Sequence, residues 1–230
     1  MAEKMIEVRH VGKVYVTGDI RTQVLFDINL EVGKGTFNSI IGASGSGKTT
    51  LLNILGTLDK PTGGEVLIDG VRTDQMKKNQ LARLRNETIG FIFQFHYLLP
   101  EFTALENVLM PVIIRKGKPD EKDIARAEEL MELVGISNVK NNLATNMSGG
   151  QQQRTAVARA LINKPKIILA DEPTGNLDSE SSENIYSRFR YINESLGTTF
   201  IIVTHDRRIA EQTDRIIGVK DGKIEMDVKK

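Results

Sequence analysis

Residues 42–49 carry the first spacing in this sequence that predicts chemistry, because GASGSGKT fits the pattern G-x-x-x-x-G-K-[ST]. The apolar run 37–41 before it is typical of a buried strand, and residues 50–55 after it are typical of an opening helix. In this order successive backbone N–H groups point at a polyphosphate, and the helix N-terminus adds its positive dipole end. A Gly/Ser-rich turn is the alternative, but the flanking segments favour a nucleoside triphosphate site. The residues expected to form this site are Gly42, Ala43, Ser44, Gly45, Ser46, Gly47, Lys48, Thr49 and Thr50.

Four side chains have expected roles in phosphate chemistry. Lys48 would reach the β- and γ-phosphates, and the Thr49 hydroxyl would bind Mg²⁺. Asp171 and Glu172 follow the apolar run 167–170, at the end of a predicted buried strand. Asp171 would help hold Mg²⁺, commonly through water, and Glu172 would polarise the water that attacks the γ-phosphate. Two carboxylates at a strand end are usually just solvated, but a phosphate loop in the same chain favours the catalytic interpretation.

A second candidate anion site begins at Ser148. This residue is expected to be the N-cap of a helix, and Gly149, Gly150 and Gln151 follow it. The two glycines leave backbone N–H groups unobstructed at the helix start, where an anion can bind. An ordinary capped helix is the alternative, and it would be preferred if this stretch stood alone. A lone Gln94 or a lone His205 would likewise be an ordinary polar group. Only the presence of Ser148–Gln151, Gln94 and His205 in one chain favours a functional interpretation.

Composition narrows the class of protein. The chain has 230 residues, a net charge of +1 from 31 basic and 30 acidic side chains, and no cysteine. The charge balance gives no overall attraction to nucleic acid, and a cysteine-free chain suits the cytosol. No signal peptide is evident at the N-terminus, and no apolar run approaches the length of a membrane span. We therefore expect a cytoplasmic protein that reaches a membrane only through another polypeptide.

The order of predicted elements indicates an α/β protein. Strand-like runs alternate with helical segments over 1–94 and again over 164–230, which predicts a mostly parallel sheet in a phosphate-loop NTPase (RecA-like) core. Two strands near the N-terminus, 5–11 and 24–32, are expected to form an antiparallel β subdomain, with a polar turn at 15–20 between them. Residues of about 95–163 read as a helical subdomain inserted into the core. We expect all 230 residues to form a single domain.

Together these features resemble the ATP-binding subunit of an ABC transporter over the full length of the chain. GASGSGKT resembles Walker A, IILADE resembles Walker B, and SGGQ resembles the signature motif. Gln94 then corresponds to the Q-loop glutamine, which also contacts Mg²⁺, and His205 to the switch histidine. Asp178 lies in a segment similar to the D-loop, and Tyr15 matches the aromatic residue that stacks on adenine. Within the family, the segments around these motifs are most similar to the lipoprotein-releasing (LolD-like) and macrolide-export (MacB-like) branch.

The resemblance implies how such a chain would work. ATP bound to one chain would be capped by Ser148, Gly149, Gly150 and Gln151 of a second chain, so ATP would hold a homodimer together. Glu172, His205 and Lys48 would be the catalytic residues, and Thr49, Gln94 and Asp171 would hold Mg²⁺. A separate transmembrane permease would be the partner, which places the chain on the inner face of the cell membrane. The alternative within the family is an ATPase of the cell-division type that regulates a membrane partner without transport.

The segment Phe95–Phe102 carries three aromatic residues in a chain that is only 5% aromatic. It follows Gln94 directly, so its position would depend on the γ-phosphate. We expect it to line a groove that accepts a short helix of the membrane partner. The alternative is that this segment is buried beneath the protein's own helices.

Overall fold

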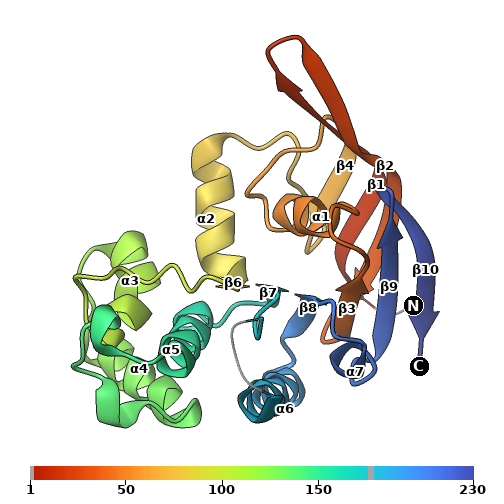
Figure 1. The fold of residues 1–230 in the computed structure, drawn as a ribbon. Helices are drawn as coiled ribbons and strands as arrows, with labels where there is room; N and C mark the ends of the chain where they lie inside the picture. Colours follow the sequence, from red (N-terminus) through yellow and green to blue (C-terminus); the bar gives the residue numbers. More distant parts are fainter. Residues whose placement is uncertain (1–2, 176–178) are drawn as a thin grey trace.

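The computed structural model of the chain describes residues 3–175 and 179–230. Two β-sheets and a group of helices make up the molecule (Figure 1). One sheet has six strands in the order β10-β9-β3-β8-β7-β6, and the other has four in the order β2-β1-β4-β5. The long antiparallel pair β1–β2 extends away from the rest of the molecule, and the helical region lies at the opposite end (Figure 1).

The six-stranded sheet carries the core of the fold. Neighbouring strands from β9 to β6 run parallel, and only the edge strand β10 is antiparallel, which confirms the predicted mostly parallel sheet. Strand β10 was not predicted, although Ile224, Met226 and Val228 alternate with polar residues; it is an edge strand whose side chains are mostly exposed. The strands are β3 (Phe37–Ile41), β6 (Ile89–Phe93), β7 (Ile167–Asp171), β8 (Thr199–Val203), β9 (Arg215–Lys220) and β10 (Lys223–Lys229).

The four-stranded sheet confirms the expected antiparallel β subdomain but corrects its bounds. Strands β1 (Lys4–Thr17) and β2 (Ile20–Gly33) are longer than predicted and are joined at Gly18 and Asp19. The prediction of a turn over 15–20 is therefore wrong, since Tyr15 pairs with Thr22 within the sheet. Side chains at this end are largely exposed, so the backbone pairs without the apolar alternation that would reveal a strand. The sheet is completed by β4 (Gly63–Ile68) and β5 (Val71–Arg72).

Capping side chains mark the start of several helices. Helix α5 (Gly149–Leu161) begins at the predicted N-cap Ser148, and α3 and α4 likewise begin at capping side chains, those of Thr103 and Asp120. None of the helices found among the described residues is long and apolar enough to cross a membrane. The remaining helices are α1 (Lys48–Leu55), α2 (Lys78–Thr88), α3 (Ala104–Lys116), α4 (Glu121–Leu133), α6 (Ser179–Leu196) and α7 (Arg207–Ala210), with two short 3₁₀ helices, η1 (Ser137–Val139) and η2 (Ala144–Asn146).

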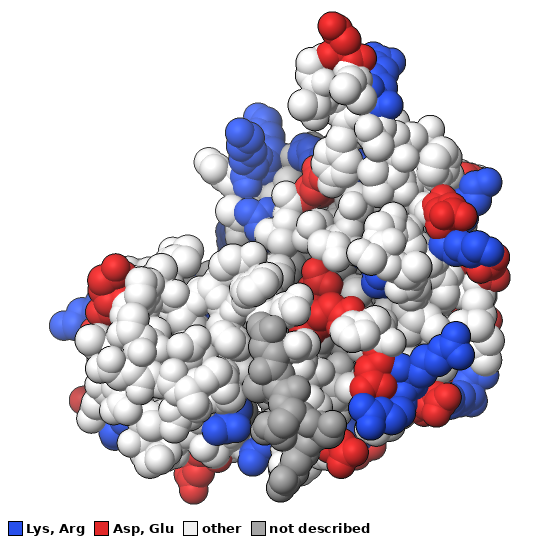
Figure 2. Space-filling model, in the orientation of Figure 1, with Lys and Arg blue, Asp and Glu red and all other residues white. Residues whose placement is uncertain are grey.

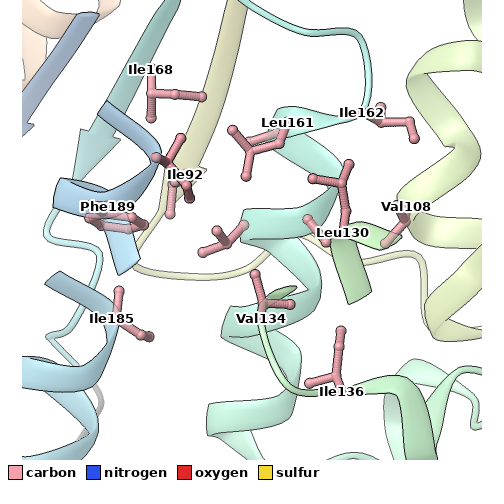
Figure 3. Packing of buried hydrophobic residues seen from close by; sticks show 14 of the residues in the cluster. Ile92, Val108, Leu130, Val134, Ile136, Leu161, Ile162, Ile168, Ile185 and Phe189 are labelled. Carbon is pink, nitrogen blue, oxygen red and sulfur yellow. The ribbon is translucent and has the colours of Figure 1, made fainter. Parts of the chain in front are cut away.

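Two hydrophobic clusters use opposite faces of the six-stranded sheet. Along β7, Ile167 and Leu169 belong to the cluster shared with α1 and the four-stranded sheet, whereas Ile168 belongs to the cluster shared with α3–α6. This alternation is the period of two expected for a strand buried on both faces. Figure 3 shows the second cluster, in which Ile168 and Phe189 lie near Leu161 of α5. The helical region is therefore packed onto the core through a continuous apolar contact.

The apolar residues at helical spacing in α4 and α6 include two side chains that lie outside this cluster. Ile124 and Leu196 are 39% and 55% exposed, although the residues at helical spacing beside them are buried. Ile124 lies in the first turn of α4, and Leu196 is the last residue of α6. The helical spacing of apolar residues continues to these ends, but no neighbouring element covers the side chains there.

Candidate active site

The phosphate loop lies between β3 and α1, in the predicted strand–loop–helix order. Gly47 precedes α1 with φ of 104°, a left-handed conformation that other residues rarely adopt. A Cβ at this position would also lie 2.9 Å from Leu25 Cδ2. The first turn of α1 receives no side-chain cap, so its N–H groups stay available to an anion.

Lys48 lies over the loop that it follows. Its Nζ donates hydrogen bonds to the carbonyl oxygens of Gly42 and Ala43, at 2.9 and 2.8 Å. The ammonium group is therefore held where a phosphate on the loop would meet it. An anionic ligand would replace neutral carbonyl acceptors by charged ones, which form shorter and stronger hydrogen bonds.

One cavity of 580 Å³ brings most of the predicted site together. Ala43 and Ser46 are not among the described residues that line it; Ser46 is buried within the loop. Val24 lines it as well, and sequence analysis missed this residue because an apolar side chain in a strand carries no chemical signal. The cavity is lined by Val24, Gly42, Ser44, Gly45, Gly47, Lys48, Thr49, Thr50, Gln94, Asp171, Glu172 and His205.

The donor set beside the loop fits Mg²⁺. Thr49 Oγ1 donates to Asp171 Oδ1 at 3.4 Å, so a hydroxyl and a carboxylate oxygen face the cavity together with Gln94. These are hard oxygen donors, which Mg²⁺ prefers. Among residues 3–175 and 179–230 no group of three or more His, Cys, Asp or Glu side chains is placed to hold a metal ion. A metal here would thus share its coordination with water and substrate phosphates, as Mg²⁺ commonly does.

Burial disfavours the charged form of the Asp171 carboxyl. It raises the pKa of Asp171 above its ordinary value, and the charge of Glu172 adds to the increase. The hydrogen bond from Thr49 and the charge of Lys48 act in the opposite direction. A nearby cation would favour the charged carboxylate and would offset the cost of its burial.

Glu172 and His205 form a pair at the mouth of the cavity. His205 Nδ1 lies 2.9 Å from Glu172 Oε2, and the two side chains are 74% and 20% exposed. Glu172 has φ of 45°, a left-handed conformation that is uncommon for residues other than glycine. The left-handed backbone is held by the N–H of Glu172, which donates to the Val203 carbonyl at 2.9 Å. The carboxylate is therefore fixed relative to both β8 and His205.

Gln94 directly follows β6 and lies against the turn that follows Glu172. A Cβ placed on Gly175 would be 2.8 Å from Gln94 Nε2, so a larger residue here would displace this side chain. The structure thus brings Gln94 to Asp171 and Glu172 across two neighbouring strands, β6 and β7.

Tyr15 is held close to α1 but does not line the cavity. Its hydroxyl donates to Asp59 Oδ2 at 2.8 Å, and Lys13 Nζ lies 4.6 Å from the ring centroid. Lys13 Nζ also donates to Asp59 Oδ1 at 2.6 Å. Burial raises the pKa of Tyr15, so the phenol stays protonated at neutral pH. Lys13 and Asp59 were not predicted, because a lone lysine and a lone aspartate carry no pattern in the sequence.

The predicted signature residues lie apart from this cavity. Ser148 Oγ accepts a hydrogen bond from the Gln151 N–H at 3.3 Å, and Gln151 Oε1 accepts one from the Ser148 N–H at 2.9 Å. Ser148 and Gly149 are exposed, and Gly150 is half-buried in the first turn of α5. This helix start does not face the phosphate loop of its own chain, because none of these residues lines the cavity. Asp178 lies outside the described residues.

Comparisons with known proteins agree with this geometry. Residues 25–175 match the family model described as "ABC transporter". The lipoprotein-releasing system ATP-binding protein LolD 1 of Rhodopseudomonas palustris is 53% identical over 215 residues, covering 93% of this chain and 95% of that protein. The dimeric structure of MJ0796, a bacterial ABC transporter cassette, superposes with a TM-score of 0.92 at 44% identity, covering 98% of each chain.

A second dimeric structure of that cassette, in a post-hydrolysis state bound to ADP and Pi, also superposes with a TM-score of 0.92, at 43% identity and 98% coverage of each chain. The similarity extends over nearly the whole chain in sequence and in fold, and the cavity brings together most of the side chains predicted to act in nucleotide hydrolysis. The chain belongs to the ABC transporter family.

Proposed function

We propose that this chain hydrolyses ATP to drive lipoprotein release or a related export process through a separate membrane subunit. The observation that carries the proposal is the cavity that joins the phosphate loop to Asp171, Glu172 and His205. The named substrate class comes from relatives such as LolD 1 of Rhodopseudomonas palustris, 53% identical to this chain. In this proposal the protein is cytoplasmic and lies against the inner face of the membrane, held there by its partner.

Phosphate binding is assigned to the loop. The N–H groups of residues 42–50 surround the polyphosphate, and Lys48 leaves its carbonyl acceptors for phosphate oxygens. Thr49, Gln94 and Asp171 would hold Mg²⁺, which would supply charge stabilisation to the phosphates. Tyr15 offers its ring to adenine, with Asp59 fixing the hydroxyl end of that ring.

Hydrolysis is assigned to the pair at the cavity mouth. Glu172 accepts a proton from the attacking water, and His205, 2.9 Å away, keeps the carboxylate in place. Lys48 stabilises the charge that develops on the transferred phosphoryl group. The products are ADP and phosphate.

The signature residues are assigned to the other chain of a homodimer. The N-terminus of α5 is exposed and lies outside the cavity of its own chain, so it is available to a nucleotide bound by a second copy. Ser148, Gly149, Gly150 and Gln151 would then cap the γ-phosphate of the partner's ATP. Two ATP molecules joining two chains give a two-fold dimer that weakens after hydrolysis.

The segment after Gln94 is assigned as the docking site of the membrane partner. Phe95 and Tyr97 are 64% and 68% exposed, so we do not adopt the alternative in which the whole segment is buried beneath the protein's own helices. Leu98 instead packs against the buried cluster, and its side chain is excluded from the docking surface. Arg159 of α5 fixes the segment by donating to the carbonyl oxygens of His96 and Tyr97, at 2.6 and 2.7 Å.

Glu172→Gln tests the proposal directly. The amide keeps the shape of the side chain but cannot act as a base, so we expect turnover to fall at least ~100-fold with nucleotide affinity retained. In proteoliposomes that contain the membrane subunit and an inserted lipoprotein, the wild-type chain should release lipoprotein with Mg-ATP and the variant should not. Wild-type turnover by Glu172→Gln would remove this residue from catalysis. Efficient ATP hydrolysis without lipoprotein release would contradict only the substrate class.

A further inference from the structure

The turn after β7 determines where the Glu172 carboxylate points. It closes at once, since the Gly175 N–H donates to the Glu172 carbonyl at 3.1 Å. Glu172 itself is in a left-handed conformation, so its orientation depends on contacts that hold this turn. Besides the bond from the Glu172 N–H to β8, a side chain from a neighbouring helix donates a hydrogen bond to this turn.

That side chain is Gln153 of α5. It is 1% exposed, and its Nε2 donates to the Pro173 carbonyl at 2.5 Å. Proline has no N–H, so this carbonyl is the whole hydrogen-bonding capacity of its backbone. The contact therefore fixes the residue next to Glu172 through the one polar group available there.

The amide of Gln153 serves this contact and no other within the described residues. Its Oε1 is buried and has no hydrogen-bond partner among residues 3–175 and 179–230. An unpaired buried acceptor costs free energy that an apolar side chain of similar size would avoid. Packing alone thus does not account for a glutamine at this position. The hydrogen bond from its Nε2 to the Pro173 carbonyl does account for it.

The same helix also presents the signature residues. Gln153 lies one turn after the N-cap Ser148, and α5 is continuous from Gly149 to Leu161. A shift of the helix start would therefore be carried to the Pro173 carbonyl, because an α-helix moves as a rigid unit over this distance. The helix is packed on the core through the cluster shown in Figure 3.

We propose that Gln153 is a positioning residue that ties the Glu172 carboxylate to the signature helix. It touches no substrate and acts through the Pro173 carbonyl. Engagement of the helix start by the partner's nucleotide would set the orientation of the base in the same chain. This inference rests on the proposed role of Glu172 as the base.

Gln153→Met tests the inference, because methionine fills similar space without a donor. We expect kcat for ATP hydrolysis to fall about 10- to 100-fold, the scale of a misplaced catalytic group, with KM and the affinity for a fluorescent ATP analogue within about twofold. Asn163→Leu is the matched control. Asn163 Nδ2 donates to the backbone carbonyl and to the Oδ1 of Asn86, both at 3.0 Å, and its Oδ1 is also buried without a partner among the described residues. This control removes a buried amide link between α2 and the end of α5, outside the cavity that Glu172 lines, and should leave kcat unchanged.

A second pair of variants separates positioning from stability. In a Glu172→Gln background, adding Gln153→Met should not lower the residual turnover further, because both changes act on one group. If Gln153→Met fails to fold, Gln153→Asn keeps the amide but falls short by one methylene, and the same loss of kcat at constant KM is expected.

Three results would overturn the inference: wild-type kcat in Gln153→Met, an equal loss in Asn163→Leu, or additive losses in the double variant. Wild-type turnover by Glu172→Gln would instead contradict the proposed function, so the two failures can be told apart.

Discussion

At the scale of single residues, the charged form of Asp171 lowers the stability of the nucleotide-free protein. Burial raises the pKa of Asp171, so folding favours its protonated form. The contribution of this carboxyl to the free energy of unfolding is fully present below the ordinary pKa of aspartate. It is lost as the pH rises through the raised pKa of the folded state, and at pH 7 the carboxylate is held at a cost.

Asp171→Asn should therefore stabilise the nucleotide-free chain while it impairs catalysis. At pH 7 we expect Tm to rise by about 1–4 °C and Mg-ATP hydrolysis to fall at least ~10-fold. Asp74→Asn is the control with the opposite sign, since the hydrogen bond from Arg72 lowers the pKa of Asp74. The Asp74 carboxylate therefore stabilises the folded protein at pH 7, and this stabilisation is lost in acid. Asp74→Asn should lower Tm and leave turnover normal. Thermal melts in the absence of nucleotide measure both, and a lower Tm for Asp171→Asn would contradict the argument.

At the scale of elements, helix α5 carries or contacts three segments of the proposed site. Its start carries the signature residues, Gln153 reaches the turn after β7, and Arg159 holds the segment after β6. Burial lowers the pKa of Arg159 to about 10, so the guanidinium stays charged at pH 7. It pairs with backbone carbonyls and leaves the exposed aromatic side chains of that segment free to meet a partner.

Phe95→Ser should accordingly uncouple the ATPase from its membrane partner. The side chain is 64% exposed, so basal ATP hydrolysis by the isolated chain should stay within about twofold of wild type. Stimulation of hydrolysis by the membrane subunit should fall ~10-fold or more, as for an aromatic anchor of an interface. Ile114→Ser removes an equally exposed apolar side chain from α3 and should leave stimulation intact. Wild-type stimulation of Phe95→Ser would mean that the partner docks elsewhere.

At the scale of the whole molecule, the two halves of the proposed nucleotide site lie on different parts of one chain. The cavity is formed by the α/β core, and the signature residues lie at the exposed start of α5. On the face shown in Figure 2, basic and acidic side chains are interspersed, and the surface over the helical region is largely uncharged. No extended patch of one sign on this face would oppose contact between two copies of the chain.

Cysteine crosslinking tests whether the site is shared between chains. The protein has no cysteine of its own, and Ser44 and Ser148 are both exposed. When a Ser44→Cys chain is mixed with a Ser148→Cys chain, Mg-ATP should promote a disulfide between them, most strongly in a Glu172→Gln background. Ser137→Cys, exposed elsewhere in the helical region, replaces Ser148→Cys in the control and should not crosslink. If a single chain carrying both cysteines links only within itself, the proposed trans arrangement is wrong.

The sequence by itself determined the fold class and most of the site. Local spacing was sufficient for the phosphate loop, for the strand ending at Asp171 and for the N-cap Ser148, because each depends on backbone geometry set by neighbouring residues. Resemblance to a family then gave Gln94 and His205 their expected places, and both line the cavity.

Only the tertiary structure decided what depends on contacts distant in sequence. It showed that Tyr15 lies in a strand and bonds Asp59, that Gln94 packs against Gly175, and that Gln153 bonds Pro173. None of these pairs is marked by periodicity or by a motif, since one polar side chain meets a partner 20 or more positions away. Their geometry follows from the crossing of strands and helices that the hydrophobic clusters hold together.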